Sequence, residues 1–358
     1  MPPSPNIEDT IRRLAAGQGF AAVRFAAASP VPRFERFTEW LARSWQGSMD
    51  YMTWNPQVRA DPSLLVEGAR SVICLAVGYA GPNSADGPVA RFARGRDYHR
   101  LLRKRCHRLM DQIRQVEPAF AGRAFVDAGP IAERSLAAAC GLGWIGGNGC
   151  VFVEALGSYV VLCEIVCNLA LTPDPPIPSR CTQCNQCVRA CPTGALGPGG
   201  MVDARRCRSY LSVEHRGPID PELWPGMEGA LFGCDLCQQA CPHNRAVAAG
   251  DAELMAADRF PPTPVLEEVL AWSAADWDVF TQGRTLRRQT YLGYLRNAIL
   301  WAGSERATEP ARRAFLRKRL LQLQSKADIA GPLAGELAWA LEQLGANQPT
   351  LQERTKGV

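Results

Sequence analysis

CTQCNQCVRACP, at residues 181–192, has the spacing C-x2-C-x2-C-x3-C-P, which is typical of bacterial iron–sulfur sites. A second stretch, CDLCQQACP at residues 234–242, repeats the last three cysteines and the proline but lacks a first cysteine. Cys207 lies between the two stretches and can supply the missing ligand. The sequence therefore predicts two sets of four thiolates, enough for two [4Fe-4S] clusters.

We expect the fourth cysteine of each run to cross to the other cluster, as in two-cluster ferredoxins. One cluster would then be held by Cys181, Cys184, Cys187 and Cys241, and the other by Cys207, Cys234, Cys237 and Cys191. Zinc is the main alternative, but structural zinc sites usually come as two separated CxxC pairs. Disulfides do not explain a repeated run that ends in proline. The other six cysteines are expected to be small buried hydrophobes: Cys74, Cys106, Cys140, Cys150, Cys163 and Cys167.

The composition is that of a folded protein with reduced thiols. The chain has 358 residues, 47% of them hydrophobic, enough for two or three domains with a sizeable core. No apolar run approaches the ~20 residues that a membrane span needs. Arg12-Arg13 resembles a twin-arginine export signal, but no apolar segment follows it, and residues 7–16 are better explained as an amphipathic helix. We therefore expect a cytoplasmic monomer without a membrane partner.

Positive charge is concentrated in two stretches. From Arg284 to Lys326 there are eleven Lys and Arg against two Glu, a net charge of +9, whereas the whole chain carries only +5. From Arg91 to Arg108 there are eight Lys and Arg against one Asp, a net charge of +7. Such stretches are typical of proteins that bind a polyanion. Most charge runs are simply solvated helix faces, so charge alone leaves a nucleic-acid partner open.

The pattern divides the chain into three regions, 1–172, 173–248 and 249–358. The first combines helical stripes, such as residues 98–116, with apolar strands, such as residues 71–79, and an apparent hairpin at 150–169, so we expect an α/β domain with an antiparallel pair. The second follows a proline-rich linker and should fold as a bacterial two-cluster ferredoxin-like domain. The third is α-helical, with a HEAT-like pattern of paired helices. The glycine-rich residues 141–148 follow a helix, so a dinucleotide site is not expected.

Short segments along the chain resemble one family. They are MDYM (49–52), RGRDYH (94–99), VDAGP (126–130) with Glu133-Arg134, GLGWIG (141–146), CRSYL (207–211), HRGP (215–218) and LRNA (295–298), together with the two cysteine runs. Each is weak alone. In this order, from about Gly47 to Gly303, the chain resembles the epoxyqueuosine reductases, cobalamin-dependent iron–sulfur enzymes of the last step of tRNA queuosine synthesis. It departs from them at Gly147, where relatives usually have Lys, and at Trp54, where some have a basic residue.

The resemblance implies a cobalamin-binding catalytic domain at 1–172. With two [4Fe-4S] clusters, the protein would convert epoxyqueuosine to queuosine at the tRNA wobble position. Asp127 matches the family's proton donor, and we expect it to be partly buried so that it stays protonated. The alternative is an Asp that caps the turn before Gly129-Pro130. The residues expected near cobalamin are Arg59, Asp127, Val151, Leu162, Tyr210 and Asp235.

The same resemblance suggests where the substrate binds. Asp97 and Tyr98 are expected to line its pocket, although Asp97 is also placed to cap the following helix. His99 is either a polar contact there or a structural histidine. The anticodon stem-loop carrying epoxyqueuosine is expected to be bound through its phosphates by Arg287, Arg288 and Arg296. An external donor must supply the electrons.

Three other functions compete with this one. A reductive dehalogenase-like enzyme for a small molecule shares the cofactors, but normally carries an export signal and has no need of a basic C-terminal region. A simple electron carrier leaves residues 1–172 unexplained. The third is an RNA-binding module with a structural cluster. Corrinoid retained by the purified protein would separate the enzymes from the last two.

Overall fold

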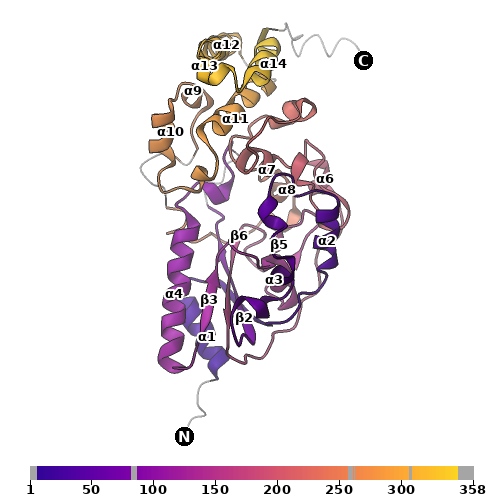
Figure 1. Cartoon of the computed structure of the whole chain (residues 1–358), viewed down its shortest axis with the longest axis vertical. Helices are drawn as coiled ribbons and strands as arrows, with labels where there is room; N and C mark the ends of the chain where they lie inside the picture. Colours follow the sequence, from indigo (N-terminus) through magenta and orange to yellow (C-terminus); the bar gives the residue numbers. More distant parts are fainter. Residues whose placement is uncertain (1–5, 82–86, 257–260, 262, 306–308, 346–358) are drawn as a thin grey trace.

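The first region is built on a four-stranded antiparallel sheet (Figure 1). The computed structural model describes residues 6–81, 87–256, 261, 263–305 and 309–345. The strand order is β1-β2-β6-β3, and the strands are β1 (Ala22–Ala27), β2 (Ser71–Gly78), β6 (Val160–Cys167) and β3 (Gly122–Phe125). The expected α/β region with antiparallel pairing is confirmed.

Both faces of the sheet are covered, which explains why β2 reads as a continuous apolar run. Ile73 and Leu75 point to one face, where they join the core formed with α1 (Ile7–Gly17) and α4 (Tyr98–Val116). Val72 and Cys74 point to the other face, toward α5 (Glu133–Ala139). Successive side chains of a strand alternate between faces, so a strand buried on both sides needs apolar residues at nearly every position.

The long helix α4 has the bounds predicted from its pattern. Four residues of its apolar stripe are completely buried, at Leu102, Cys106, Leu109 and Ile113, whereas Val116 at its end is 50% exposed. The opposite face leaves basic and polar residues exposed, among them Arg100, Arg103, Lys104, His107 and Arg108. Asp97 caps the helix by accepting the amide of His99 at 3.0 Å. Most of the first basic stretch is therefore a solvent-facing surface of this helix, but Arg94 and Arg105 are buried.

The predicted hairpin at residues 150–169 is wrong. β5 (Val151–Phe152) pairs with β4 (Trp144–Ile145) in a separate small sheet, whereas β6 lies between β2 and β3. Only an isolated bridge, between Val153 and Gly157, links the two ends of the turn. All eight residues of β6 pair with residues of β2. Because this ladder is longer than any that β6 could form with the two-residue strand β5, β6 pairs with β2 and not with β5.

The middle region consists of loops and one-turn helices. The helices are α6 (Gln186–Arg189), α7 (Arg208–Val213) and α8 (Leu236–Gln239). The chain then returns to the first region, where Asp251 and Glu253 each form an ion pair at 2.8 Å with Arg105 of α4. The smaller helices α2 (Glu35–Ala42) and α3 (Pro56–Ala60) belong to the first region. The segment after residue 248 thus packs on the sheet domain before the C-terminal helices begin.

The C-terminal region is helical in its described part, as predicted. Its helices are α9 (Leu266–Val269), α10 (Ala274–Thr281), α11 (Tyr291–Ser304), α12 (Pro310–Gln324), α13 (Ala327–Ala330) and α14 (Ala334–Gly345). α11 is largely buried, and α14 packs against both α11 and α12. The core around α11 also contains Val89 and Phe232 from the other two regions, so all three regions share packed contacts. None of the described helices combines the length and apolar character that crossing a membrane requires.

Candidate active site

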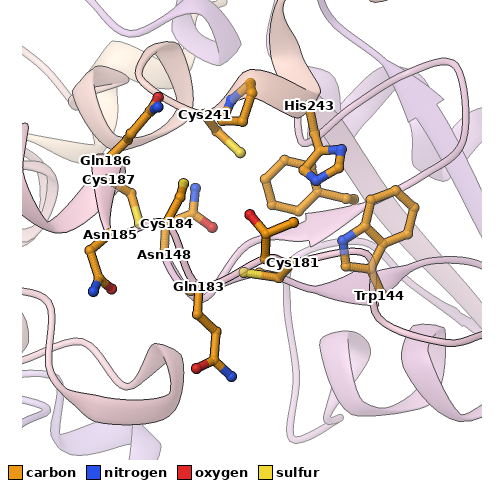
Figure 2. A pocket seen from close by; sticks show the side chains of 15 residues that line it. Trp144, Asn148, Cys181, Gln183, Cys184, Asn185, Gln186, Cys187, Cys241 and His243 are labelled. Atoms are coloured by element: carbon orange, nitrogen blue, oxygen red, sulfur yellow. The ribbon is translucent and has the colours of Figure 1, made fainter.

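Four of the predicted cluster ligands line one cavity. Cys181, Cys184 and Cys187 come from the segment that runs into α6, and Cys241 follows α8. Figure 2 shows these cysteines around one space, with Trp144 and His243 at its side. In the part of the chain that the structure describes, no three metal-ligating side chains converge as they would around a single ion. The four thiols surround a cavity instead, which suits the larger size of a cluster.

The other four predicted ligands also lie near one another. Cys191 is close enough to Cys237 to interact electrostatically with the Cys237 thiol. Cys234 and Cys237 interact in the same way with the Cys207 thiol. Burial raises the pKa of the Cys207 thiol to about 12, so this thiol keeps its proton until a metal takes the proton's place. The helices α6 and α8, one from each cysteine run, are in contact.

A ninth cysteine lies beside the second set. The thiol of Cys150 forms a hydrogen bond with Cys237, and Cys150 is only partly buried. The prediction of a simple buried hydrophobe is confirmed for the five other cysteines and is incomplete for Cys150. No spacing rule points to Cys150, because it follows the glycine-rich residues 141–148 and belongs to neither cysteine run.

Gly147 also lies at the first cavity. A β-carbon added to Gly147 would stand 3.7 Å from the sulfur of Cys181 and 3.8 Å from that of Cys187. Gly147 therefore faces two predicted cluster ligands.

Asp127 begins the turn that follows β3, and its backbone is left-handed, with φ of 45°. A residue other than glycine adopts this conformation when surrounding contacts hold it there. Glu133, the first residue of α5, makes such a contact, since its Oε1 accepts the N–H of Asp127 at 2.9 Å. The side chain of Asp127 is 56% exposed, so the expected burial is not found.

The beginning of α4 contacts the carboxyl of Asp127. The hydroxyl of Tyr98 donates to Oδ2 of Asp127, and Nε2 of His99 lies 3.7 Å from the same oxygen. The rings of Tyr98 and His99 stack with their centroids 4.1 Å apart. On the other side of its ring, His99 places Nδ1 2.8 Å from Oδ1 of Asp97. The fold thus brings together four residues that the sequence analysis named as candidates: Asp97, Tyr98, His99 and Asp127.

His99 is positively charged at neutral pH. Burial alone would lower its pKa, but hydrogen bonds to Asp127 and Asp97 outweigh burial and raise the pKa to about 9. Burial works against the charge of Asp97 too, yet the bond to His99 keeps the pKa of Asp97 below its usual value. Burial, followed by the charge of Asp127, raises the pKa of Tyr98. Tyr98 therefore stays protonated and acts as a hydrogen-bond donor.

Behind Asp127 lies a pair of carboxyls that sequence reasoning did not single out as functional. Glu164 of β6 is completely buried, and in the described structure its carboxyl meets that of Glu133. Burial, then the charge of Asp127, raises the pKa of Glu133 to about 8, and burial raises that of Glu164. Glu164 is fully buried and Glu133 is partly buried, and two carboxyls this close favour retaining a proton between them. A glutamate inside the apolar strand VVLCEIVC was the available signal.

Tyr51 and Arg288 lie on a further side of the site. The guanidinium of Arg288 is 5.8 Å from the centre of the Tyr51 ring and pairs with Glu214 at 2.7 Å. Burial raises the pKa of Tyr51, and the charges of Glu214 and Asp127 add to that increase. Arg288, predicted to bind tRNA, is exposed and belongs to the surroundings of Asp127.

The other two predicted tRNA contacts differ from each other. Arg287 is exposed and pairs with Asp278. Arg296 is only 2% exposed and donates to the carbonyls of Leu211, at 2.6 Å, and His215, at 3.3 Å. The prediction that Arg296 holds a phosphate is therefore wrong. Its charge belongs to a basic stretch of the sequence, but α11 is a core helix and its arginine binds backbone carbonyls.

The residues expected near cobalamin occupy several environments. Arg59 is 9% exposed, and its Nε has no hydrogen-bond partner in the described structure. The hydroxyl of Tyr210 accepts the amide of Ser48 at 2.6 Å. Asp235 is buried and accepts the amide of Arg91 at 2.8 Å. The two remaining apolar residues belong to one buried cluster on the α5 face of the sheet: Val151 and Leu162.

Comparisons with known proteins cover nearly all of this chain. Residues 180–244 match a family model described as a 4Fe-4S double cluster binding domain, and residues 59–128 match one described as "Epoxyqueuosine reductase QueG, DUF1730". The epoxyqueuosine reductase of Alicycliphilus denitrificans is 36% identical over 95% of this chain and 97% of its own length. That of Escherichia coli K12 is 36% identical over 85% of this chain and 80% of its own length.

Solved structures agree on the fold. The epoxyqueuosine reductase of Streptococcus thermophilus superposes with a TM-score of 0.83 at 25% identity, covering 99% of this chain and 94% of that one. An epoxyqueuosine reductase solved with an epoxyqueuosine-modified tRNA stem loop has a TM-score of 0.79 at 24% identity, covering 95% of this chain and all of that one. With the identity and coverage of the relatives above, the conclusion is that this chain belongs to the epoxyqueuosine reductase family.

Proposed function

We propose that this protein reduces epoxyqueuosine to queuosine at the wobble position of tRNA. The observation that carries this proposal is the exposed carboxyl of Asp127, held through its amide by Glu133 and hydrogen-bonded by Tyr98. Epoxide opening puts negative charge on oxygen, and a positioned carboxylic acid can protonate that oxygen. Relatives that match almost the whole chain carry the name of this activity.

We infer that the two clusters have crossed ligands. The cavity lined by Cys181, Cys184 and Cys187 takes its fourth thiol from Cys241 of the second run, whereas Cys191 lies near Cys237. The second cluster would then be held by Cys191, Cys207, Cys234 and Cys237. A fourth ligand from the other run ties the two halves of the region together and keeps the clusters close, which suits the passage of electrons.

We infer that cobalamin lies against residues 46–64. This segment exposes large apolar side chains, with Trp54 64% and Leu64 59% exposed, and it contains two buried polar atoms without partners in the described structure, Oε1 of Gln46 and Nε of Arg59. A corrin has apolar faces and amide groups at its edge, so both features fit it. Tyr210 binds the same segment through Ser48. When bound, the clusters and cobalamin supply the electrons for the reduction.

The other expected contacts, Val151, Leu162 and Asp235, remain part of the proposal. Asp127 would meet the epoxide at the edge of the cofactor, with Tyr98 and Asp97 along the pocket. The apolar cluster that contains Val151 and Leu162 lies on the α5 side of the sheet, and α5 begins with Glu133.

We infer three domains, 1–172 with cobalamin, 173–248 with the clusters and a HEAT-like helical domain at 249–358. The anticodon stem-loop would lie over Arg287 and Arg288, because phosphates are attracted to exposed cations. A structure of the same fold has been solved with an epoxyqueuosine-modified tRNA stem loop, which supports a stem-loop as the partner. The protein would act as a cytoplasmic monomer with an external electron donor.

The proposal is tested with anaerobically prepared protein that carries both clusters and cobalamin. It is incubated with an anticodon stem-loop containing epoxyqueuosine and a strong chemical reductant, and nucleosides are identified by mass spectrometry. We expect queuosine to form, and Asp127→Asn to slow its formation by about 10²- to 10⁴-fold while cofactor content and stem-loop affinity are retained. A loaded wild-type protein that makes no queuosine would reject the function. Near-normal turnover of Asp127→Asn would move the proton donor elsewhere.

A further inference from the structure

The proposed reaction consumes two protons, and Asp127 carries one. Conversion of an epoxide to an alkene breaks both C–O bonds, takes up two electrons and two protons, and releases one molecule of water. One proton goes to the oxygen when the first C–O bond breaks. The other converts the resulting hydroxyl into water when the second C–O bond breaks. If the proposed function holds, on which this inference rests, a second proton must therefore reach the same oxygen within one turnover.

We propose that His99 provides the second proton by transferring it from Nε2 to Oδ2 of Asp127 once Asp127 has protonated the epoxide oxygen. Asp127 is then an acid again and protonates the hydroxyl, which leaves as water. Both protons pass through Asp127, and the electrons come from the reduced cofactors of the proposed function. His99 is left neutral and regains its proton from solvent, to which its side chain is 33% exposed.

The geometry supports a transfer in this direction. Asp97 holds the ring through Nδ1 at 2.8 Å, so Nε2 points toward Asp127, whose Oδ2 is 3.7 Å away. The stacked ring of Tyr98 keeps the imidazole in its plane. A separation of 3.7 Å is longer than a hydrogen bond, but catalytic hydrogen bonds are often long in the free enzyme and shorten when substrate binds. Loss of the Asp127 proton creates an anion that attracts the imidazolium.

The charges around His99 favour its protonated form. Asp97, at the start of the same helix, is ionised, and Asp127, from the turn after β3, becomes ionised once it has given its proton to the epoxide oxygen. Arg100 is the nearby cation on the same helix that acts on Asp97. Behind Asp127, burial keeps Glu133 neutral below a pKa of about 8. The pKa of His99, about 9, means that the ring carries both protons at neutral pH.

The two other neighbours of Asp127 are poorer proton sources. Tyr98 donates to Oδ2, but burial raises its pKa, so it retains its own proton. The Glu133 carboxyl accepts a hydrogen bond from the backbone N–H of Asp127. In the described structure it has no hydrogen bond to the Asp127 carboxyl through which a proton could pass. His99 is the group at this oxygen that is both charged and in contact with solvent.

The test compares His99→Gln with His107→Gln, the same change at an exposed histidine of the same helix. Glutamine can place an N–H near Asp127 but cannot transfer a proton. We expect kcat of His99→Gln to fall by about 10²-fold or more, with unchanged KM for the stem-loop, and His107→Gln to match wild type. Equal kcat values for the two variants would overturn the proposal.

Two readouts separate proton transfer from a structural role. Wild-type kcat should fall as pH rises through about 9, where His99 loses its proton, and His99→Gln should lack this fall. Added imidazole should restore activity to His99→Ala, since a free base can enter the space left by the ring. A variant that keeps the alkaline fall, or an alanine variant that imidazole does not rescue, would overturn the proposal. Cluster and corrinoid content confirm that each variant is folded.

A measurement without turnover distinguishes this inference from the proposed function. The chain has four histidines, so NMR of histidine-labelled protein can follow the protonation of each ring. We expect the His99 ring to titrate near pH 9 and to titrate at lower pH in Asp97→Asn. A His99 ring that is neutral at pH 7 would reject the inference. Failure of wild type to make queuosine, with His99 still charged, would reject the function instead.

Discussion

Glu133 holds the backbone of Asp127, because its Oε1 accepts the Asp127 N–H at 2.9 Å while its carboxyl meets the fully buried Glu164. This contact stabilises a left-handed residue that is not glycine. Asp127 is therefore positioned through its main chain by a residue six positions further along, and its side chain is 56% exposed, where a substrate can reach it.

The first prediction tests this support. Glu133→Ala removes the acceptor, and a hydrogen bond of this kind is worth about 1–3 kcal/mol, so we expect kcat to fall by about 10- to 100-fold with little change in KM for the stem-loop. Glu133→Gln keeps an acceptor oxygen and should remain near wild type. The two variants are compared by steady-state kinetics at equal cofactor loading. Equal losses in both would show that charge, rather than the bond to Asp127, is what matters.

The second prediction concerns stability and pH. The pKa of Glu133 is about 8 in the folded protein, above its usual value of 4.5, so the folded state holds a proton that the unfolded chain loses. This contribution is complete below pH 4.5 and is lost as pH rises through about 8. Glu133→Gln does not titrate, so its Tm should fall less than that of wild type between about pH 5.5 and pH 8.5. Parallel Tm curves for both proteins would contradict the assigned shift.

The third prediction concerns the clusters. Cys207→Ala should lose one cluster and keep the other, so iron should fall from about eight to about four per chain. Cys150→Ala is the matched control, because Cys150 touches Cys237 but is not a proposed ligand, and it should keep about eight. Iron analysis and electron paramagnetic resonance of anaerobically reconstituted protein give the answer. Full iron content in Cys207→Ala would disprove its assignment as a ligand.

The fourth prediction concerns tRNA. Replacing Arg287 and Arg288 together by Ala should weaken stem-loop binding and reduce its salt dependence by about one unit of slope for each phosphate that the protein no longer neutralises. Arg114→Ala is the control, since Arg114 is an exposed arginine in an ion pair with Asp111 near the far end of α4. Binding is measured over a series of salt concentrations. An unchanged slope in the double variant would remove these arginines from the interface.

The fifth prediction concerns the first cluster. Gly147→Lys would place an ammonium group near the sulfur atoms of Cys181 and Cys187. Positive charge favours the reduced, more negative form of a cluster, so the reduction potential of this cluster should rise. Gly147→Gln, similar in reach but uncharged, should leave it nearly unchanged. Redox titration of the two variants makes the comparison, and identical potentials would show that this position does not tune the cluster.

The roles of Arg296 and Glu164 could not be predicted from the sequence pattern. Arg296 belongs to a basic stretch of the sequence, but the packing of α11 buries it among carbonyl groups. Glu164 sits in a strand that reads as apolar, and its partner, Glu133, lies 31 positions earlier in the chain. Burial and long-range contact decide both roles, and neither is encoded in local spacing.

The cysteine runs, the helix at 98–116 and the strand at 71–79 could be recognised from the chain alone, because local periodicity and ligand spacing are set by backbone geometry over a few residues. The pairing of β6 with β2, the exposed left-handed Asp127 and the contact of His99 with both Asp97 and Asp127 required the folded molecule. Each depends on which distant segments pack together, and such packing follows from the total burial of the chain rather than from any one segment.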